Sequence, residues 1–515
     1  MTTYASTLQA PTIEYGELAP VLVVFGVALV GVLVEAFVPR AGRYVCQLVV
    51  SLVGLVAAFV AVVALAGTRH LAVMGAVAID GPTLFMQGTI LLVSILAILL
   101  IGERGLGGDT DAFTPQASAV PGSPAEREAT KAGVVQTEVF PLSLFAICGM
   151  LIFPASGDLL TMFVALEVFS LPLYLLCGLA RRRRLLSQEA AVKYFLLGAF
   201  SSAFFLYGMA LLYGYAGTVE LTGIASAVKD HTGNDSLALV GVGLLAVGLL
   251  FKVGAIPFHS WIPDVYQGAP TPITGFMAAA TKIAAFGALL RIFYVALPDL
   301  RVDWRPVLWG VAILTMAVGA VLAVTQTDMK RMLAYSSVAH TGFILTGVIA
   351  LNDAGLSAVL FYLLAYGFST LGAFAIVTVV RDSSGEVTNM ARWAGLGRRS
   401  PFIAGVFALF LLAFAGIPLT SGFVGKFAVF QAAAEGGAVP LVIVGVVSSA
   451  VAAFFYARVI VLMFFSEPPA NVATVARSSV LTTTVIVISA ATTAVLGIFP
   501  QPVLDLATKA GEFLH

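Results

Sequence analysis

Long hydrophobic runs, separated by short polar connections, make up most of the chain between residues 18 and 498. A helix needs roughly 20 apolar residues to cross the hydrocarbon core of a membrane. About 14 runs approach or exceed this length: 18–38, 45–66, 83–101, 139–155, 158–179, 189–214, 236–268, 271–297, 306–325, 330–351, 354–380, 401–434, 438–465 and 478–498. Lipid offers the backbone no hydrogen bonds, and the runs are too long for barrel strands. The pattern therefore predicts an all-α integral membrane protein with about 14 transmembrane helices.

Two of these runs, 236–268 and 401–434, are too long to cross a membrane as straight helices. Each contains a proline, Pro257 in the seventh run and Pro418 in the twelfth. Proline removes a helical hydrogen bond and clashes with the preceding turn. We therefore expect helices 7 and 12 to be discontinuous.

The two interrupted runs are the seventh and the twelfth. Because their positions differ by five, which is an odd number, they should cross the membrane in opposite directions. The sequence AVKYFLL at 191–197 also resembles AVLFYLL at 358–364. These matches predict two inverted five-helix repeats, an arrangement in which transporters bind ions near broken helices. The expected parts are an N-terminal three-helix segment (1–101), a flexible cytoplasmic loop rich in Gly, Pro and charge (102–138), the two repeats (139–300 and 301–466) and a C-terminal fourteenth helix (467–515).

The composition agrees with a membrane protein, since 60% of the 515 residues are hydrophobic and 10% are charged, against about 25% charged in soluble domains. Basic and acidic residues both number 27, so net charge does not favour a nucleic-acid partner. Cys46, Cys148 and Cys177 each stand alone, which argues against a disulfide framework, an iron–sulfur cluster or a zinc site. The lipid bilayer is the partner that composition indicates.

Successive connections between the runs should lie on alternate sides of the membrane, and the two sets of connections differ in their number of basic residues. One set holds 16: Arg40, Arg43, Arg104, Arg127, Lys131, Arg181, Arg182, Arg183, Arg184, Lys330, Arg331, Arg381, Arg392, Arg398, Arg399 and Arg477. The other set holds five: Arg69, Lys229, Arg301, Arg305 and Lys509. Because basic connections favour the cytoplasm, both termini are predicted on the outer side of a bacterial-type plasma membrane. The first 20 residues lack Lys and Arg, so the first run should not be a cleaved signal peptide.

Six basic residues fall within the predicted spans: Lys193, Lys252, Lys282, Arg291, Lys426 and Arg458. Burying an ammonium group costs several kcal/mol without a partner or water. Burial disfavours the charged form of lysine, so a buried lysine can release its proton, whereas arginine stays charged. The preference for lysine at these positions favours proton transfer over a purely structural role.

The most deeply placed lysines are Lys252, Lys282 and Lys426. Lys252 precedes Pro257 by five residues and Lys426 follows Pro418 by eight, so each lies close to a predicted helix break. The alternative is a lysine that extends to the membrane surface, which fits these depths poorly. We expect all three amines to take part in proton translocation.

Glu167 is the most isolated acid, and its cation would be Lys252 or a lysine of a neighbouring subunit. A protonated glutamic acid bonded to a helix is the alternative.

His259 and His340 could bridge the lysines, because imidazole accepts and donates protons near neutral pH, although a lone histidine is often merely hydrogen-bonded. Lys193 is a candidate relay or the partner of Glu189 in a helical ion pair. Glu35 is expected to serve helix packing or subunit contact.

Three motifs resemble the antiporter-like membrane subunits of respiratory complex I, the proton-translocating NADH-quinone oxidoreductase. They are FKVGAIPFHSWIPDVYQGAPTPITGFMAAATKIAAFG at 251–287, TQTDMKRMLAYSSVAHTGF at 325–343 and AGIPLTSGFVGKF at 415–427. The resemblance covers most of the chain after residue 139. Lysine at position 426, the number of predicted helices and the lack of a long lateral helix make it most similar to the subunit N branch of that family.

This resemblance implies roles by position. Glu167 and Lys252 would be the paired acid and base of the first half-channel, Lys282 and His259 the central relay, and Lys426 the terminal group of the second half-channel. It also implies other membrane and peripheral subunits of complex I as partners, with NADH, FMN, iron–sulfur and quinone chemistry on those chains and no cofactor or metal on this one.

Two other functions stay open from the sequence. The first is a subunit of a multisubunit cation/proton antiporter, which resembles this family closely. Sodium sites would add oxygen ligands near the breaks, where only Thr420 and Ser421 are candidates. The second is a membrane scaffold that transports nothing.

Overall fold

The structure is a computed structural model, and it describes residues 13–106, 111–230, 235–382, 385–468 and 472–514. The first part of the chain forms α1 (Ala19–Phe37), α2 (Arg40–Ala64), β1 (His70–Ala72), β2 (Val77–Ile79), α3 (Gly81–Ile101) and α4 (Pro124–Lys131). The middle part forms α5 (Val139–Ile152), η1 (Phe153–Ala155), α6 (Leu159–Cys177), α7 (Arg184–Ala216), α8 (Leu221–Lys229), α9 (Asp235–Val253), α10 (Trp261–Gly268), α11 (Thr271–Phe276), η2 (Met277–Thr281), α12 (Lys282–Arg291) and η3 (Ile292–Ala296). The last part forms α13 (Arg301–Val324), α14 (Met329–Ala350), α15 (Asp353–Val379), β3 (Val380–Asp382), β4 (Gly385–Glu386), η4 (Met390–Trp393), α16 (Leu396–Arg399), α17 (Pro401–Ala415), α18 (Ser421–Glu435), α19 (Val439–Phe465), β5 (Thr474–Val475), α20 (Val480–Ile498) and α21 (Gln501–Ala510).

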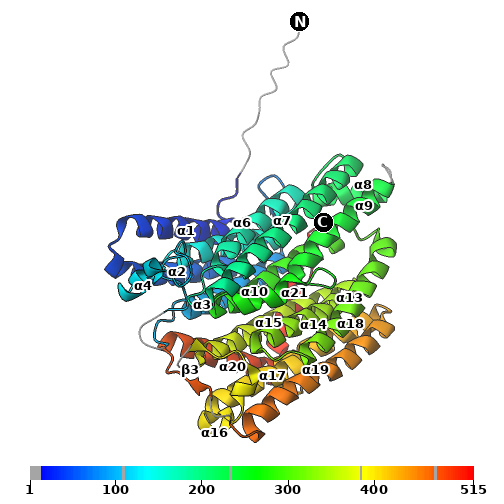
Figure 1. Cartoon of the computed structure of the whole chain (residues 1–515). Coiled ribbons are helices and arrows are strands. Elements are labelled where there is room, and N and C mark those ends of the chain that lie inside the picture. Colours follow the sequence, from blue (N-terminus) through cyan, green and yellow to red (C-terminus); the bar gives the residue numbers. More distant parts are fainter. Residues whose placement is uncertain (1–12, 107–110, 231–234, 383–384, 469–471, 515) are drawn as a thin grey trace.

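The molecule is a bundle of long, roughly parallel or antiparallel helices (Figure 1). Within the described residues, 12 helices are long and apolar enough to cross a membrane, and two shorter apolar helices lie at Val139–Ala155 and Pro401–Ala415. The chain is therefore a mostly helical integral membrane protein, as predicted. The total of 14 crossings stays a prediction.

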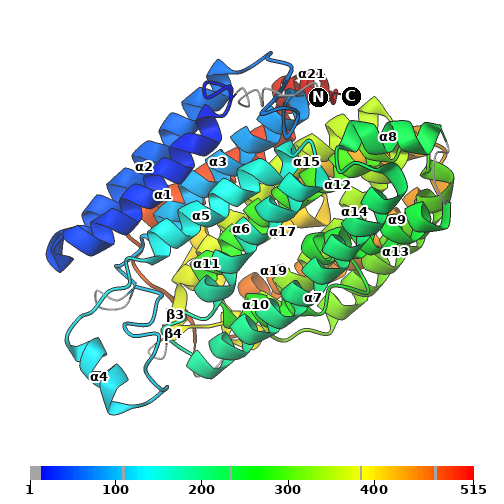
Figure 2. The same ribbon diagram turned by 90° about the horizontal axis from the view of Figure 1, so that it is seen from above.

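Burial separates a central group of helices from a peripheral one. Every residue in the most apolar stretch of 271–296 is buried. In the corresponding stretches of α14 and α15, 94% of the residues are buried. Only 33% of the corresponding stretch in α2 is buried, and Figure 2 shows α1 and α2 together at one edge of the bundle. A helix that is apolar all round lies in a core, and one with an exposed apolar face must contact lipid or another chain.

The two long runs that contain proline each form two helices. The seventh run is divided into α9 and α10, which are separated by residues 254–260 with Pro257 among them. The twelfth run is divided into α17 and α18, which are separated by residues 416–420 with Pro418 among them. Gly416, directly after α17, has φ +78°, a left-handed conformation in which glycine has no Cβ penalty.

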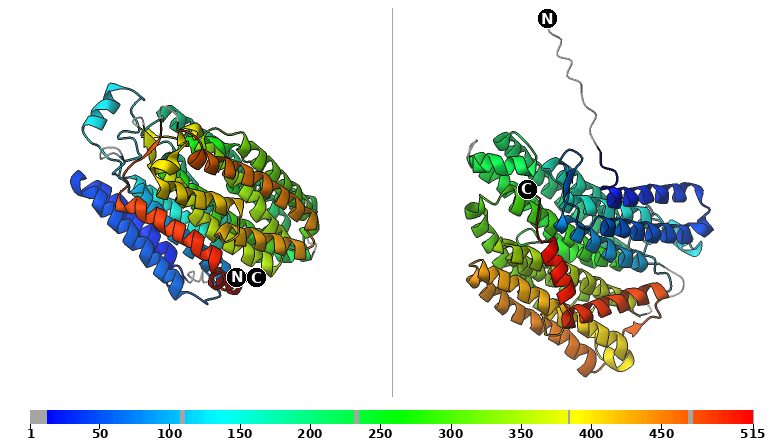
Figure 3. Two further views of the ribbon diagram at one scale, coloured as in Figure 1. Left: turned by 90° about the horizontal axis from the view of Figure 1, so that it is seen from below. Right: turned by 180° about the vertical axis from the view of Figure 1, so that it is seen from behind.

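Both termini contact the same connection, residues 65–80 between α2 and α3. The carboxylate of Glu14 accepts a hydrogen bond of 2.9 Å from Val73 N. From the other terminus, Glu512 pairs with Arg69 at 2.5 Å, and Figure 3 shows α20 and α21 passing behind the bundle toward this end. The two ends of the described chain therefore lie on one side of the molecule.

Short elements outside the long runs escaped sequence prediction. They include α4, α8 and α21, which have eight, nine and ten residues, and the strands, which form a two-stranded and a three-stranded antiparallel sheet. None of these segments is apolar over a membrane-crossing length, so the hydrophobic pattern gave no signal. The segment 102–138, expected to be a flexible loop, contains α4.

Candidate functional site

Lys252 occupies the last turn of α9, directly before the interruption, and its side chain is 5% exposed. Its Nζ donates a 2.7 Å hydrogen bond to Ser170 Oγ on α6. The same amine lies 5.3 Å from the ring centroid of Phe169 and 5.7 Å from that of Tyr174. The Lys252 ammonium is thus surrounded by aromatic rings, and its bonded partner is a neutral hydroxyl.

Glu167 interacts electrostatically with Lys252, but no ion pair joins them within the described residues. One of its carboxylate oxygens, Oε1, is buried without a hydrogen-bond partner. Glu167 also falls in line with the exposed side chains of α6, which are Leu160, Val164, Leu171 and Leu175. The predicted acid is therefore close enough to influence Lys252, and it is partly exposed beside the apolar outer face of α6.

Lys282 begins α12, immediately after the π-helical turn η2, and is 3% exposed. Its Nζ donates to three oxygens on α14: Ser337 O at 2.6 Å, Ser337 Oγ at 2.7 Å and Thr341 Oγ1 at 2.8 Å. These three partners are neutral. π-helical turns are frequent at functional sites because they displace the residues that follow them.

Thr341 connects Lys282 to the interruption after α9. Its hydroxyl accepts from Lys282 and lies 2.7 Å from Val253 O, to which it donates. Val253 is the last residue of α9 and follows Lys252 in the chain. A carbonyl at the end of a helix has no partner within the helix, so the break supplies the acceptor that this hydroxyl uses.

His340 is 2% exposed and precedes Thr341 on α14. Its Nδ1 lies 2.7 Å from the Tyr362 hydroxyl and its Nε2 lies 3.3 Å from that of Tyr456. It interacts electrostatically with both Lys282 and Lys426. A cavity of about 10 Å³ beside it is lined by His340, Tyr362, Ala365, Tyr366, Ser369, Ala413, Phe414, Ser421, Gly422 and Gly425. His340 is therefore near enough to both lysines to interact with their charges, and its role as a bridge between them stays a prediction.

Lys426 on α18 is 5% exposed and is bonded to the end of α17. Its Nζ donates to Phe414 O at 2.8 Å and Ala415 O at 3.1 Å, and to Ser449 Oγ at 2.8 Å. Phe414 and Ala415 are the last two residues of α17, so their carbonyls are released by the second interruption. Both interruptions thus place free carbonyls beside this group of lysines.

Two other predicted relay residues lie apart from this group. His259 is half-buried in the interruption after α9, with its ring centroid 6.3 Å from that of Tyr335. Lys193 is half-exposed and pairs at 2.6 Å with both Glu189 and Asp264, and Asp264 also pairs with Arg331 at 2.7 Å. The helical ion pair considered for Lys193 is therefore present.

The sequence missed a buried ion pair at the end of α12. Arg291, 1% exposed, donates to Asp80 Oδ1 at 2.8 Å and to Oδ2 at 2.9 Å, and also to Thr83 Oγ1 and Pro154 O. Burial acts to raise the pKa of Asp80, but the Arg291 charge and the hydrogen bonds hold it below its ordinary value. The two opposite charges of this pair compensate each other inside the protein, which suits a structural role.

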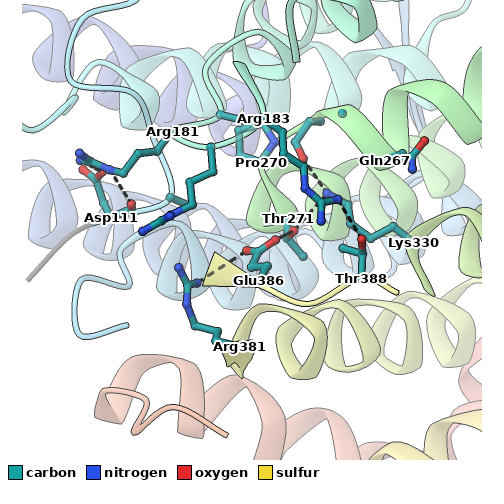
Figure 4. Close-up of a pocket in the computed structure, with 15 residues that line it drawn as sticks. Asp111, Arg181, Arg183, Gln267, Pro270, Thr271, Lys330, Arg381, Glu386 and Thr388 are labelled. Carbon is teal, nitrogen blue, oxygen red and sulfur yellow. Dashed lines mark hydrogen bonds and ion pairs between the residues drawn. The ribbon is translucent and has the colours of Figure 1, made fainter. Parts of the chain in front are cut away.

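A basic cavity of about 110 Å³, drawn in Figure 4, is lined by Arg181, Arg183, Lys330 and Arg381 among others. The hydrophobic pattern assigned Lys330 to a basic connection between two runs. In the structure it lies within α14 and is 3% exposed. Its Nζ donates to Ala269 O at 2.8 Å and to Thr271 Oγ1 at 3.1 Å. Thr271 in turn donates to Glu386 at 2.5 Å. Arg183, which donates to Thr388 at 2.9 Å, is a neighbour of this group.

Across the described ranges, no three His, Cys, Asp or Glu side chains form a group that could hold a metal ion. What the interior does offer is a series of amines, hydroxyls, an imidazole and free carbonyls. Such groups can pass protons between one another by exchanging donor and acceptor roles.

A family model described as NADH:quinone oxidoreductase/Mrp antiporter, TM matches residues 156–452, which include Glu167 and all three central lysines. The chain belongs to this family of membrane-embedded subunits. It is 72% identical to NADH-quinone oxidoreductase subunit N of Rhodococcus opacus (strain B4), over 99% of this chain and 98% of that one. The resemblance inferred from the three motifs, including the subunit N branch, is thereby confirmed.

Two solved structures have a similar fold. A chain of respiratory complex I from Thermus thermophilus with bound aureothin is 32% identical, with a TM-score of 0.76, over 95% of this chain and 99% of that one. A chain of the Mrp complex from Dietzia sp. DQ12-45-1b is 23% identical, with a TM-score of 0.80, over 96% of this chain and 97% of that one. The second likeness concerns the fold alone.

Proposed function

We propose that this chain is a proton-translocating membrane subunit of NADH-quinone oxidoreductase. The observation that carries the proposal is that three lysines, each at most 5% exposed, have only neutral hydrogen-bond partners in the described interior. A buried ammonium without a carboxylate is costly, so its charged and neutral forms are closer in free energy than at a surface. Such a group can take up and release a proton.

The residues would act in order along the bundle. Glu167 and Lys252 form the first half-channel, Lys282 the centre with His340 beside it, and Lys426 the terminal group of the second half-channel. His259, in the interruption between α9 and α10, and Lys193, which pairs with Glu189 and Asp264, are candidate relays. The electrostatic contacts of His340 with Lys282 and Lys426 support the central step.

The helix pairs α9–α10 and α17–α18 would be two discontinuous membrane-spanning helices in inverted repeats. The free carbonyls of Val253, Phe414 and Ala415 support this proposal, since they bond directly to the lysines or to their hydroxyl partner. The full arrangement would have 14 crossings, with both termini on the outer side of a bacterial plasma membrane. The excess of basic residues at the opposite end supports that orientation.

Energy for pumping would come from quinone reduction on other subunits. NADH, FMN, iron–sulfur and quinone chemistry would also belong to those chains. The position of Glu167 beside the apolar outer face of α6 supports a contact with a neighbouring membrane subunit, whose cation could change the charge balance at Lys252.

The proposal is tested with the assembled complex reconstituted in liposomes, by following NADH oxidation, quinone reduction and lumen acidification together. Lys252→Met should keep the complex assembled and strongly reduce acidification per electron, while the control Lys509→Met, an exposed lysine, leaves it unchanged. Undiminished acidification by an assembled Lys252→Met complex would favour the scaffold. Cation-driven proton exchange by an assembly that oxidises no NADH would favour the antiporter.

A further inference from the structure

A second and larger cavity, of about 670 Å³, lies at the basic end of the bundle where α1 is connected to α2. One wall is formed by the start of α2 and by Arg104, which follows α3, and the other by residues 129–138 together with Pro115 and Gln116. Figure 2 shows the segment around α4 projecting at this end, beyond α1 and α2. This cavity is separate from the one around Lys330 and from the lysines of the interior.

Three arginines and one acid, Glu138, line the cavity, and the arginines are incompletely neutralised. Arg40 is exposed and has no ion-pair or hydrogen-bond partner in the part of the chain that the structure describes. The guanidinium of Arg104 stacks 3.3 Å from the ring centroid of Tyr44, and its Nε is buried without a partner. Arg43 forms an ion pair of 3.5 Å with Glu35, whose carboxylate also accepts a hydrogen bond from Gln47. These groups create a positive site in a partly enclosed space.

Hydrogen bonds from Arg184 and Gln136 hold the segment that forms the outer wall. Arg184, 6% exposed, donates to Ala117 O at 3.0 Å, to Ala119 O at 3.2 Å and to the Glu126 carboxylate at 3.1 Å. Gln136 donates to Pro115 O at 3.4 Å across the segment. These bonds fix residues 115–136 of the segment next to the cavity.

The cavity lies at the level where a membrane surface is expected. Arg40 begins α2, and α1 ends at Phe37, so the arginines flank two candidate spans. Directly beside them, the side chains of Phe37 and Val45 are 80% and 60% exposed. A ligand with an anionic head and apolar chains would match both features, because guanidinium groups bind phosphate oxygens and basic pockets at helix ends bind lipid headgroups.

We propose that this cavity binds the phosphate headgroup of an anionic phospholipid, with the acyl chains lying along the exposed faces of α1 and α2. Segment 129–138 covers the headgroup. In this way the bound lipid joins the peripheral α1–α2 pair to the loop that is anchored on Arg184.

The test uses the intact complex in nanodiscs of phosphatidylglycerol or of phosphatidylcholine, with hydrogen exchange of residues 129–138 as the readout. Phosphatidylglycerol should slow exchange in this segment, and Arg40→Gln with Arg104→Gln should abolish the effect. Binding of a short-chain phosphatidylglycerol to the complex in detergent should weaken roughly thirtyfold in the same double variant. The matched control, Arg398→Gln with Arg399→Gln, removes two exposed arginines of α16 and should retain both effects.

Several results would overturn the proposal. Equal exchange in the two nanodiscs, or equal lipid binding by the two double variants, would show that the cavity holds no anionic lipid. Equal protection by glycerol phosphate in phosphatidylcholine nanodiscs would assign the site to a free phosphate. Retained NADH oxidation shows that the variant complexes are assembled, so each of these outcomes can be interpreted.

Discussion

Lys282 and Arg291 lie at the two ends of α12, but their surroundings differ in kind. Arg291 donates to both oxygens of Asp80, at 2.8 and 2.9 Å, so its charge is matched by an acid. Lys282 donates only to hydroxyls and a carbonyl of Ser337 and Thr341. One helix therefore carries an arginine whose charge is matched by an acid, and a lysine whose hydrogen-bond partners are all neutral. Under the proposed function, the first cation stabilises the fold and the second takes up and releases a proton.

The largest effect should follow from breaking the compensated pair. Arg291→Met leaves Asp80 buried without its cation, which should cost about 3–5 kcal/mol and greatly reduce the amount of assembled complex. Thermal denaturation and quantification of the assembled complex measure this. Adding Asp80→Asn should recover part of the loss, because no unpaired charge then remains. An Arg291→Met complex as stable as the parent would contradict the structural role.

Removing the uncompensated cation should leave stability nearly unchanged but strongly reduce proton pumping. Lys282→Met replaces a buried amine by an apolar side chain of similar length, so stability should change by no more than about 1 kcal/mol or should increase. Proton pumping should nevertheless fall strongly. The melting temperature of the assembled complex and lumen acidification are compared on the same preparation. A loss of stability as large as that of Arg291→Met would remove the distinction between the two cations.

A smaller effect is expected from the acid that lies near Lys252 without contacting it. Glu167→Gln keeps the shape of the side chain but removes a charge interaction of about 1–2 kcal/mol, so pumping should fall roughly tenfold. Acidification rates of the reconstituted complex measure this, with Glu435→Gln as the exposed control. Unchanged pumping would show that Glu167 does not act on Lys252.

The smallest effect concerns a surface contact. The hydrogen bond and charge of Glu17 raise the pKa of His70 above its ordinary 6.5. Because the folded-state pKa is raised, the contact stabilises the N-terminal segment fully below pH 6.5 and is lost as pH rises through the raised value. A spin label at Tyr15→Cys should become more mobile on going to alkaline pH. Glu17→Gln should remove this pH dependence, and its persistence would exclude His70 as the group responsible.

The sequence predicted the interior lysines because a charge within a long apolar run is conspicuous. Lys252, Lys282 and Lys426 are all buried, and the proline-containing runs are each divided into two helices near them. Their partners were not predictable, since Ser337, Thr341 and Ser449 are ordinary residues within apolar helices. Only tertiary packing brings these hydroxyls to the amines.

Two other buried charges, Asp80 and Lys330, were harder to foresee. Asp80 lies 211 residues from Arg291 and at the start of a run, where an acid usually caps a helix and faces water. Lys330 was placed in a connection because it lies at a run boundary, yet its amine is bonded inside the bundle. Boundary residues are ambiguous in a pattern based on hydrophobicity, because the same position suits a solvated charge or a buried pair.

The most direct test of the account is the number of protons pumped per electron by the Lys282→Arg complex. Arginine keeps the positive charge at the centre of the bundle but does not release its proton. If proton release by the lysine amine is required, the variant should assemble, oxidise NADH and pump fewer protons per electron than the parent. A ratio equal to that of the parent would show that only the charge at this position matters, and proton transfer through Lys282 would be contradicted.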